Sequence, residues 1–482
     1  MEASFGPRQL CRSCCRWLRR LPDRFPFGLA PFLILLMTLG AAGWKVLQSA
    51  RPREATLTLW TFANIHYFAY EKALHPAAPA SGDAAQGRTF EQAHPGVSVS
   101  VQLVHNTAIN NRLRAAFEAG LDVPDLVEVE ITPIGSFFRG PPESIGFRDL
   151  TPYLKKAGFL EAQRFVTTRL APYSRGDCIY GMPHDVHPVM LAYRRDLFEQ
   201  LGIDAESLTT WDKFIAAGRR VTRPGARYMI MLPEVEQWGL QTVMYQRGAD
   251  YFDAQGRLRM DDELAAQTLA WYVRLLAGPN RIASDPGFWT SAFYQALEKG
   301  YVLSCICPDW RSSMTEVNTR GMEKVPGNMA LMPLPAFEEG GRRTSTWGGT
   351  MIGITRKCPN PDLAWELALH LYTDRQTLAT IFRETNIIPP VRDVWDNPVY
   401  DEPRAYWSGQ RIGRLYMALA PQVPRTYPSP FLPIAAAKLS EALSGCVSRY
   451  RDSGEEGFEE FVRKRLKESA DYVRKQMERN PF

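Results

Sequence analysis

Alternation of apolar and polar residues divides the first third of the chain into strands and helices. Residues 55–62 (ATLTLWTF) and 97–104 (VSVSVQLV) alternate with a period of two, which is typical of strands with one buried face. A helix that ends near His94 separates them. Residues 110–120 (NNRLRAAFEAG) predict a helix that stops at a glycine, and residues 124–130 (PDLVEVE) predict a third strand. Strands that alternate with helices in this way predict a parallel α/β layer.

The stretch around which the rest of the chain is organised is 180–198 (YGMPHDVHPVMLAYRRDLF). It opens as a turn, carries His184, Asp185 and His187, and then becomes apolar over residues 189–193. This pattern predicts a polar loop that leads into a buried strand. Such a strand brings hydrogen-bonding side chains to a place where water is partly excluded, as a small-molecule site requires. A polar turn in front of an ordinary core strand is the alternative interpretation.

Two later stretches interrupt the regular pattern in a similar way. Residues 346–354 (TWGGTMIGI) contain paired glycines, which permit unusual dihedral angles and close approach of the backbone. Residues 385–391 (TNIIPPV) separate two helical regions. Between these stretches, residues 361–372 predict a helix with Asn360 as its N-cap. Residues 455–477 predict a charged helix with an apolar stripe for core packing, formed by Phe458, Phe461, Val462, Leu466, Tyr472 and Val473.

Between the first and second of these stretches, two further features are clear. Thr209 with Asp212 predicts a capping box at the start of a helix. Residues 301–307 (YVLSCIC) predict a strand, and the PDWR sequence that follows places Trp310 at its exit.

The succession YGMP … YRRDLFEQLGI … TTWDKF, within residues 180–214, resembles the extracellular solute-binding proteins of ABC transporters. The resemblance is to family 1, the carbohydrate-binding group that includes the maltose and oligosaccharide binders. The GYVLSCIC stretch with PDW, and the TrpGlyGlyThr stretch, are similar to that family's strand before a sugar-contacting loop and to its second lobe crossing. The likeness covers roughly residues 55–450, by the order and character of segments rather than by one motif.

This resemblance implies an α/β, two-lobed periplasmic-binding-protein (type II) fold with hinge crossings. The three interrupted stretches would be the crossings between the lobes. Lobe one would comprise residues 54–187 and 349–385, and lobe two residues 188–348 and 386–482.

The N-terminal segment predicts a membrane anchor. Residues 25–44 carry no charged side chain over 20 positions, and a helix of 20 residues spans about 30 Å, the thickness of the hydrocarbon layer. Six arginines precede this run, so the positive-inside rule places residues 1–24 in the cytoplasm and the chain after the anchor, 25–47, outside. We expect a single helix in the inner membrane and a periplasmic or extracellular soluble part. A cleaved signal peptide is the rival interpretation.

Charge and cysteine content exclude other classes of protein. The net charge of +5 arises in the first 53 residues, and the slightly acidic remainder offers no field for nucleic acid. Of the eight cysteines, Cys11, Cys14 and Cys15 would lie on the cytoplasmic side, and an odd number remains outside. This spacing predicts no disulfide framework. Cys305 and Cys307 share one face of a strand and are interpreted as buried small residues rather than a zinc pair.

Binding of a sugar requires flat apolar faces for its ring and polar partners for its hydroxyls. Most tryptophans are expected in the core, but three lie at strand ends or next to a crossing and are predicted to line the cleft: Trp60, Trp310 and Trp347. The predicted polar ligand-binding residues are Asn64, Glu128, Glu130, His184, Asp185, His187 and Asn386.

A metal site at His184, Asp185 and His187 is the competing use of these side chains. No His or Cys partner at a recognisable spacing accompanies them, so neither a metal nor a cofactor is predicted.

Enzyme classes find little support in the sequence. It contains no GxSxG, HExxH, Walker A or GxGxxG motif in the required setting. A glycosidase needs only two carboxylates, so Glu130 with Asp185 keeps a glycan-acting enzyme or a metal-dependent hydrolase as the alternative. The function we expect, as the resemblance implies, is not enzymatic: a membrane-anchored component of an ABC transporter that captures a carbohydrate and delivers it to the permease subunits. A sensor subunit that binds sugar beside a signalling protein is a third possibility.

Overall fold

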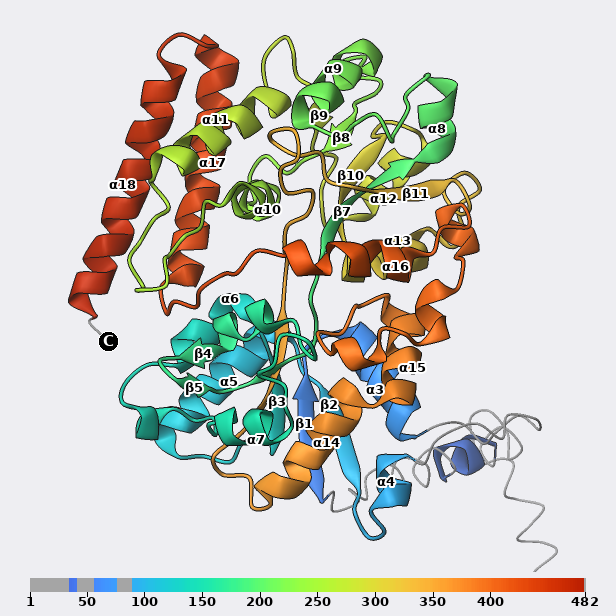
Figure 1. Cartoon of the computed structure of the whole chain (residues 1–482), viewed down its shortest axis with the longest axis vertical. Coiled ribbons are helices and arrows are strands. Elements are labelled where there is room, and N and C mark those ends of the chain that lie inside the picture. The colour runs from blue at the N-terminus through green and yellow to red at the C-terminus, as the bar shows by residue number, and fades with distance from the viewer. Residues whose placement is uncertain (1–33, 41–55, 76–88, 481–482) are drawn as a thin grey trace, which may run out of the picture. The chain divides into compact units, whose positions relative to one another are not determined.

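Two five-stranded sheets, each covered by helices, carry the fold (Figure 1). The computed structural model describes residues 34–40, 56–75 and 89–480. We call the first sheet with the helices that pack on it the first lobe, and the second sheet with its helices the second lobe. Both lobes belong to one compact unit that begins at Leu57.

The first sheet has the strand order β2-β1-β3-β12-β6. Its strands are β1 (Leu57–Thr61), β2 (Val99–Leu103), β3 (Leu126–Glu130), β6 (Met182–Pro183) and β12 (Thr350–Ile354). β1 pairs in parallel with β2 and β3, which confirms the predicted parallel layer, and β12 adds an antiparallel strand between β3 and β6. The alternation read from the sequence is visible in β1, where every second residue is buried.

The second sheet has the order β11-β7-β10-β8-β9. Its strands are β7 (Val189–Arg194), β8 (Ile230–Met231), β9 (Ala283–Ser284), β10 (Ser304–Pro308) and β11 (Met329–Pro333). All six residues of β7 are buried, as its unbroken apolar sequence predicts for a central strand covered on both faces. A separate pair of short strands, β4 (Ser174–Arg175) and β5 (Cys178–Ile179), lies between β3 and β6 in the chain.

Helices from two distant parts of the chain pack in the first lobe. They are α3 (Asn64–Leu74), α4 (Phe90–Ala93), α5 (Asn106–Ala119), α6 (Ile131–Ile134), α7 (Thr151–Lys156), α14 (Pro361–Thr373) and α15 (Arg375–Thr385). Helix α14 begins as predicted, because the side chain of Asn360 accepts a hydrogen bond from the backbone N–H of Leu363. Helix α15 packs against α3, although the two are far apart in sequence.

The second lobe is richer in helices. They are α8 (Arg195–Gln200), α9 (Trp211–Val221), α10 (Trp238–Arg247), α11 (Glu263–Leu276), α12 (Ser291–Glu298), α13 (Asp309–Thr319), α16 (Ile412–Leu419), α17 (Leu432–Ser453) and α18 (Phe458–Arg479). Thr210, and not the predicted Thr209, caps α9 by accepting from the N–H of Lys213, because the chain enters the helix one residue later. Helix α18 packs on α17 and α11, and of its predicted stripe Tyr472 is 46% exposed.

Short 3-10 helices complete the described chain: η2 (Gly135–Phe137), η3 (Pro142–Ser144), η4 (Thr167–Arg169), η5 (Ala171–Tyr173), η6 (Arg392–Val394), η7 (Pro398–Asp401), η8 (Ala405–Trp407) and η9 (Ala420–Gln422).

The chain passes between the sheets three times, at the three stretches singled out in the sequence. The first connection, residues 184–188, joins β6 to β7. The second, residues 344–349, precedes β12. The third, residues 386–391, follows α15 and leads to helices that pack with the second sheet.

Two predictions concern the described cysteines and the anchor. The five described cysteines are all free, and Cys305 and Cys307 are buried, as predicted. Within the described ranges no helix has both the length and the hydropathy that crossing a bilayer requires. The predicted anchor, 25–47, lies outside the described residues apart from the helical residues 34–40.

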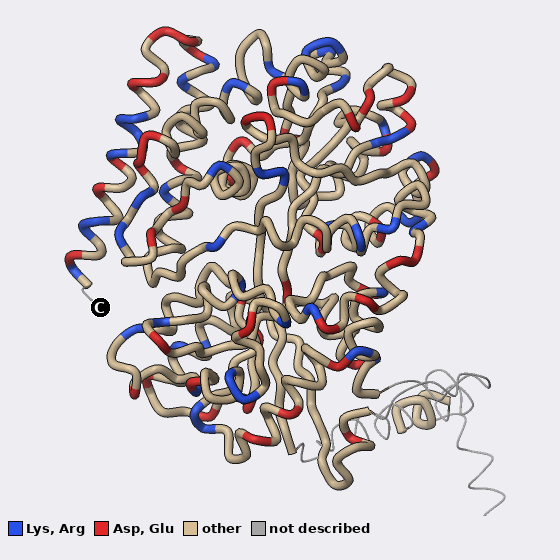
Figure 2. Tube along the Cα trace, in the orientation of Figure 1, with Lys and Arg blue, Asp and Glu red and all other residues tan. Residues whose placement is uncertain are grey.

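Acidic and basic side chains are interspersed over both lobes. Figure 2 shows no extended region of a single sign along the described chain.

Candidate ligand-binding site

Four tryptophans gather beside the second connection, and we call them the indole cluster: Trp238, Trp289, Trp310 and Trp347. The ring centroids of Trp310 and Trp347 are 5.3 Å apart, and those of Trp289 and Trp310 are 6.1 Å apart with nearly parallel planes. Trp310 Nε1 donates to the backbone oxygen of Trp347 at 2.9 Å. Trp289 is 48% exposed, so the cluster presents an accessible indole ring.

The sequence predicted two members of this cluster and missed the other two. Trp310 lies at the exit of β10 and Trp347 in the second connection, as predicted. Trp289 precedes α12 and Trp238 begins α10, neither of which is a strand end. The adjacent aromatic pair Phe288 and Trp289 after a proline-glycine turn was the available signal.

A buried arginine, Arg311, packs against the aromatic rings of the cluster. The guanidinium carbon of Arg311 lies 3.9 Å from the centroid of the Phe288 ring and 5.7 Å from that of Trp347. Phe288 in turn packs 5.2 Å from Trp347. A cation over several aromatic faces holds the rings in place.

Glu236 is a third residue that the sequence did not indicate. Its Oε2 atom is buried and has no hydrogen-bond partner among the described residues. Burial raises the pKa of Glu236, and a hydrogen bond from Trp289 opposes that shift. A carboxylate oxygen without a partner can accept a hydrogen bond from a hydroxyl group, and an exposed indole beside it offers a flat apolar face.

Glu130 lies at the end of β3 in the first lobe, with Asp185 and His187 as its charged neighbours. Its carboxylate accepts hydrogen bonds from the backbone N–H and the hydroxyl of Thr132, at 2.9 and 3.1 Å, and so caps α6. Burial raises the pKa of Glu130 to about 7, against the opposing effect of the Thr132 donors. The side chain keeps partial exposure and has no cationic partner in an ion pair within the described chain.

The paired glycines of the second connection link Glu130 to the indole cluster. The N–H of Ile131, next to Glu130, donates to the oxygen of Gly349 at 2.9 Å. Gly348 has a φ of +88°, and a Cβ there would lie 3.3 Å from Trp310 Nε1. A Cβ on Gly349 would lie 2.4 Å from the Arg169 guanidinium. The close approach predicted for these glycines is therefore present.

Glu128, in contrast, is enclosed in the first lobe. It accepts hydrogen bonds from Thr61 Oγ1 at 2.5 Å, from Tyr372 at 2.6 Å and from Tyr70, and its Oε2 lies 3.0 Å from His66 Nδ1. Burial alone would raise the pKa of Glu128, but His66, His184 and the Thr61 hydroxyl outweigh it and lower the pKa to about 2. Protein groups thus surround this carboxylate.

Asp185 is also buried, and protein donors use both of its oxygens. Oδ1 accepts from Arg169 at 2.9 Å, and Oδ2 accepts from the N–H of Thr350 at 2.9 Å and lies 3.1 Å from His187 Nε2. Burial alone would raise the pKa of Asp185, but His187, His184 and Arg169 outweigh it and hold the pKa well below its usual value. The residue joins the first connection to the start of β12.

His187 lies between two carboxylates that come from different parts of the chain. Its Nδ1 is 2.6 Å from Asp309 Oδ1, at the start of α13, and its Nε2 faces Asp185. Burial alone would lower the pKa of His187, but the two carboxylates outweigh it and raise the pKa to about 9. The ring is therefore an imidazolium at neutral pH. The backbone of His187 is left-handed, with a φ of +52°.

Hydrogen bonds tie the three connections to one another. Val186 N–H donates to the oxygen of Ile388 at 3.0 Å, and Ile388 N–H donates to Asp309 Oδ2 at 2.8 Å. Arg169 donates to Thr346 Oγ1 at 3.0 Å, in the second connection. Asp185, His187, Asp309 and Arg169 therefore form a charged network, which we call the connection network.

The remaining predicted residues lie in different surroundings. Trp60 is partly buried at the end of β1, and Asn64 is exposed at the start of α3. Asn386 is buried, with its side-chain amide donating to Ser312 Oγ at 3.0 Å and Glu316 Oε1 at 2.8 Å. His184 is buried next to His66, with ring centroids 4.2 Å apart.

A cavity of about 740 Å³ lies where residues of both lobes meet. Its lining includes Phe138 and Arg175 from the first lobe and Asp253, Arg425 and Tyr427 from the second. Beside it the lobes touch, because a Cβ on Gly135 would lie 2.4 Å from the backbone of Ser429. No sequence pattern indicated this cavity.

Comparisons with known proteins give relatives along most of the chain. A curated arabinooligosaccharide-binding protein of Halalkalibacterium halodurans is 26% identical over 398 residues, 82% of this chain and 84% of the relative. A lactose-binding protein of Rhizobium radiobacter is 23% identical over 339 residues, 69% of this chain and 76% of the relative. The solved structure of the sugar-binding protein MalE from Xanthomonas citri matches with a TM-score of 0.68 at 17% identity, over 88% of this chain and 99% of that one.

The family itself is shown by a model that matches more than half of the chain. The model for bacterial extracellular solute-binding proteins aligns with residues 71–377, which include the first and second connections and strands of both sheets. The two-sheet architecture found here agrees with that match and with the MalE likeness. The chain belongs to the bacterial extracellular solute-binding proteins.

Proposed function

We propose that this protein captures a carbohydrate between its two lobes and delivers it to the permease of an ABC transporter. The observation that carries the proposal is the indole cluster, with Trp289 half exposed, across the Gly348–Gly349 backbone from the carboxylate of Glu130. Flat apolar rings beside carboxylates suit the two kinds of surface on a sugar. The relatives named for arabinooligosaccharide and lactose support the same ligand class.

In this proposal a small number of residues contact the ligand. Trp289 and Trp310 stack on the apolar face of a sugar ring, and Glu236 and Glu130 bind its hydroxyls. Trp60 and Asn64, at the end of β1 and the start of α3, are further proposed contacts from the first lobe. Capture forms no covalent bond, and no cofactor takes part in it.

The three connections act as the hinge. We take the lobe boundaries to be residues 54–187 and 349–385 for the first lobe, and 188–348 and 386–482 for the second. A ligand that contacts both lobes favours the arrangement in which they approach, and this shift in population is what the permease recognises. The predicted anchor, 25–47, would hold the soluble part at the outer face of the inner membrane.

A glycan-acting enzyme is the weaker candidate. The carboxylate pair it would use is Glu130 with Asp185, but protein donors use both oxygens of Asp185. A glycosidase requires two carboxyl groups that reach the scissile bond. Recovery of an added oligosaccharide unchanged after incubation with the purified protein separates capture from turnover.

Substituting Trp289→Ala is expected to weaken carbohydrate binding at least about tenfold, because it removes the accessible stacking surface. Isothermal titration with arabino- and galacto-oligosaccharides measures the change. The melting temperature is expected to stay close to that of the wild type, since Trp289 is 48% exposed. Tyr472→Ala, at a 46% exposed ring on α18, is the matched control and should bind normally. Equal affinities in all three proteins would remove Trp289 from the site.

Substituting Gly135→Val is expected to hold the lobes apart where they touch, because its Cβ would overlap the backbone of Ser429 at 2.4 Å. We expect about a tenfold loss of ligand affinity and a larger radius of gyration in the presence of ligand by small-angle X-ray scattering. Gly321→Val is the control, since nothing lies within 4 Å of its Cβ. An unchanged affinity and radius for Gly135→Val would show that this contact plays no part in closure.

A further inference from the structure

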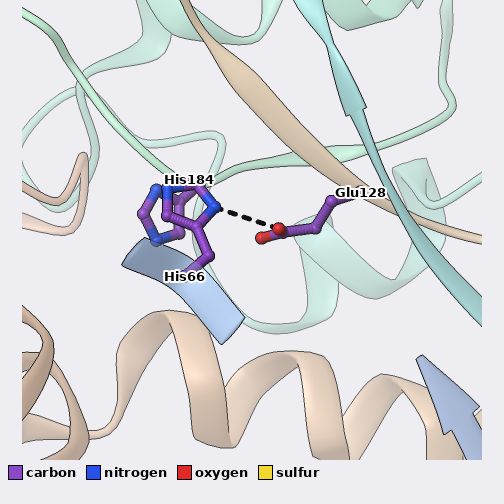
Figure 3. Close-up of side chains that lie close together, drawn as sticks. All are labelled: His66, Glu128 and His184. Carbon is purple, nitrogen blue, oxygen red and sulfur yellow. Dashed lines mark hydrogen bonds and ion pairs between the residues drawn. The ribbon is translucent and has the colours of Figure 1, made fainter. Parts of the chain in front are cut away.

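Two imidazoles and one carboxylate meet in the core of the first lobe (Figure 3). They are His66 from α3, Glu128 from β3 and His184 directly after β6, and we call them the imidazole–carboxylate cluster. One potential ligand atom of each lies within 4.8 Å of the other two, and all three side chains are buried. Three separate elements of the first lobe therefore place metal-ligating groups at one point.

His184 is the residue of the cluster whose two ring nitrogens lack a hydrogen bond. Neither Nδ1 nor Nε2 makes a hydrogen bond to a described residue, and the nearest acidic oxygen, Asp185 Oδ2, lies 3.7 Å from Nδ1. A buried polar group without a partner is unfavourable by about 1–3 kcal/mol, so proteins retain one only for a reason. The ring is 4.2 Å from His66 and 5.0 Å from Tyr372, centroid to centroid, which packs its faces but satisfies neither nitrogen.

We propose that the imidazole–carboxylate cluster binds a single divalent cation of the zinc type, as a structural ion of the first lobe. Two histidines and one glutamate are a donor set that Zn²⁺ accepts, with bonds of about 2.0–2.2 Å. Tetrahedral bonds of that length place neighbouring ligand atoms about 3.4 Å apart. The 3.0 Å between His66 Nδ1 and Glu128 Oε2 is already close to that separation.

The surroundings of the cluster suit a bound cation. Tyr70, Tyr372 and Thr61 donate hydrogen bonds to the Glu128 carboxylate and orient it, as groups behind metal ligands do. Because the three side chains are buried, we expect the ion to enter as the first lobe folds.

This site is distinct from the one considered in the sequence. His184 belongs to both, but Asp185 and His187 are committed to the connection network. His66 was not considered, since it lies on a helix and its partners are far away in sequence. The inference does not depend on the proposed carbohydrate function.

The test uses the purified full-length protein, unfolded in chelator and refolded with or without Zn²⁺. We expect one equivalent of Zn²⁺ to remain after gel filtration, measured by inductively coupled plasma mass spectrometry. X-ray absorption at the zinc edge should show two imidazole ligands and a carboxylate. Less than about a tenth of an equivalent, or a shell of oxygen ligands alone, would overturn the proposal.

Variants then locate the ion. His184→Gln should weaken Zn²⁺ binding at least about tenfold in competition with a chromogenic chelator. His94→Gln is the matched control, since His94 Nε2 lies 2.9 Å from Glu366 in a histidine–carboxylate pair at the surface. Equal Zn²⁺ affinity in the two variants contradicts the site. If His184→Gln does not fold, the absorption spectrum of the wild-type protein decides the question.

Discussion

Substituting Asp185→Ala is expected to lower the free energy of unfolding by about 3–5 kcal/mol. The substitution leaves the Arg169 guanidinium and the His187 imidazolium buried without their shared carboxylate, and it leaves the N–H of Thr350 without an acceptor. Removing one partner of a buried ion pair is costly because the other charge stays in a medium that solvates it poorly. Chemical denaturation of the purified protein, followed by circular dichroism, measures the loss.

The control for this prediction is an aspartate–arginine pair at the surface. Asp393 accepts from Arg164 at 2.7 Å, with side chains that are 42% and 41% exposed. Asp393→Ala should change the free energy of unfolding by no more than about 1 kcal/mol, since exposed ion pairs contribute little. If Asp185→Ala keeps wild-type stability and loses carbohydrate affinity instead, Asp185 contacts the ligand, as the sequence predicted.

Stability is expected to fall by about 3 kcal/mol between pH 6.5 and pH 9 because of His187. The Asp185 and Asp309 carboxylates raise the pKa of His187 in the folded protein to about 9, against about 6.5 in the unfolded chain. A raised pKa of a basic group stabilises the folded state fully below the unfolded pKa. The stabilisation is then lost as pH rises through the folded pKa.

The same titration with His187→Asn isolates this contribution. Asparagine tolerates the left-handed backbone, here φ of +52°, better than most residues and carries no proton in this range. Its free energy of unfolding should start lower and vary less with pH over the same window. Parallel pH curves for the two proteins would show that His187 is neutral in the folded state.

The sequence predicted the elements that local pattern determines. Strands β1, β2 and β3 of the first sheet, the buried β7 and the helix capped by Asn360 were predicted, because alternation, apolar runs and caps depend on neighbours in the chain. The three connections were found for the same reason, since glycines or prolines interrupt the regular pattern of strands or helices there. Thr210 in place of Thr209 shows the usual error of one residue at a helix start.

The surroundings of a polar side chain could not be predicted from the sequence, because they do not depend on neighbouring residues in the chain alone. Glu128 and Glu130 are two residues apart on one strand, yet helices α3 and α14 enclose the first while the second keeps partial exposure. His187 and Asp309 meet although they are 122 positions apart. Only packing of distant segments decides whether such a group faces a ligand or another part of the protein.

The order of strands in the first sheet bears on how the chain folds as it is made. Strand β3 pairs with β12, in which Ile352 lies opposite Glu128. This edge of β3 therefore stays unpaired until Ile352 has been synthesised. The second sheet draws all its strands from residues 189–333, an uninterrupted stretch. Long-range pairing is slow to form and leaves a strand edge open meanwhile. We therefore expect the second sheet to form first on a nascent chain. Until β12 is made, the β3 edge that pairs with it would be the exposed surface for a chaperone to cover.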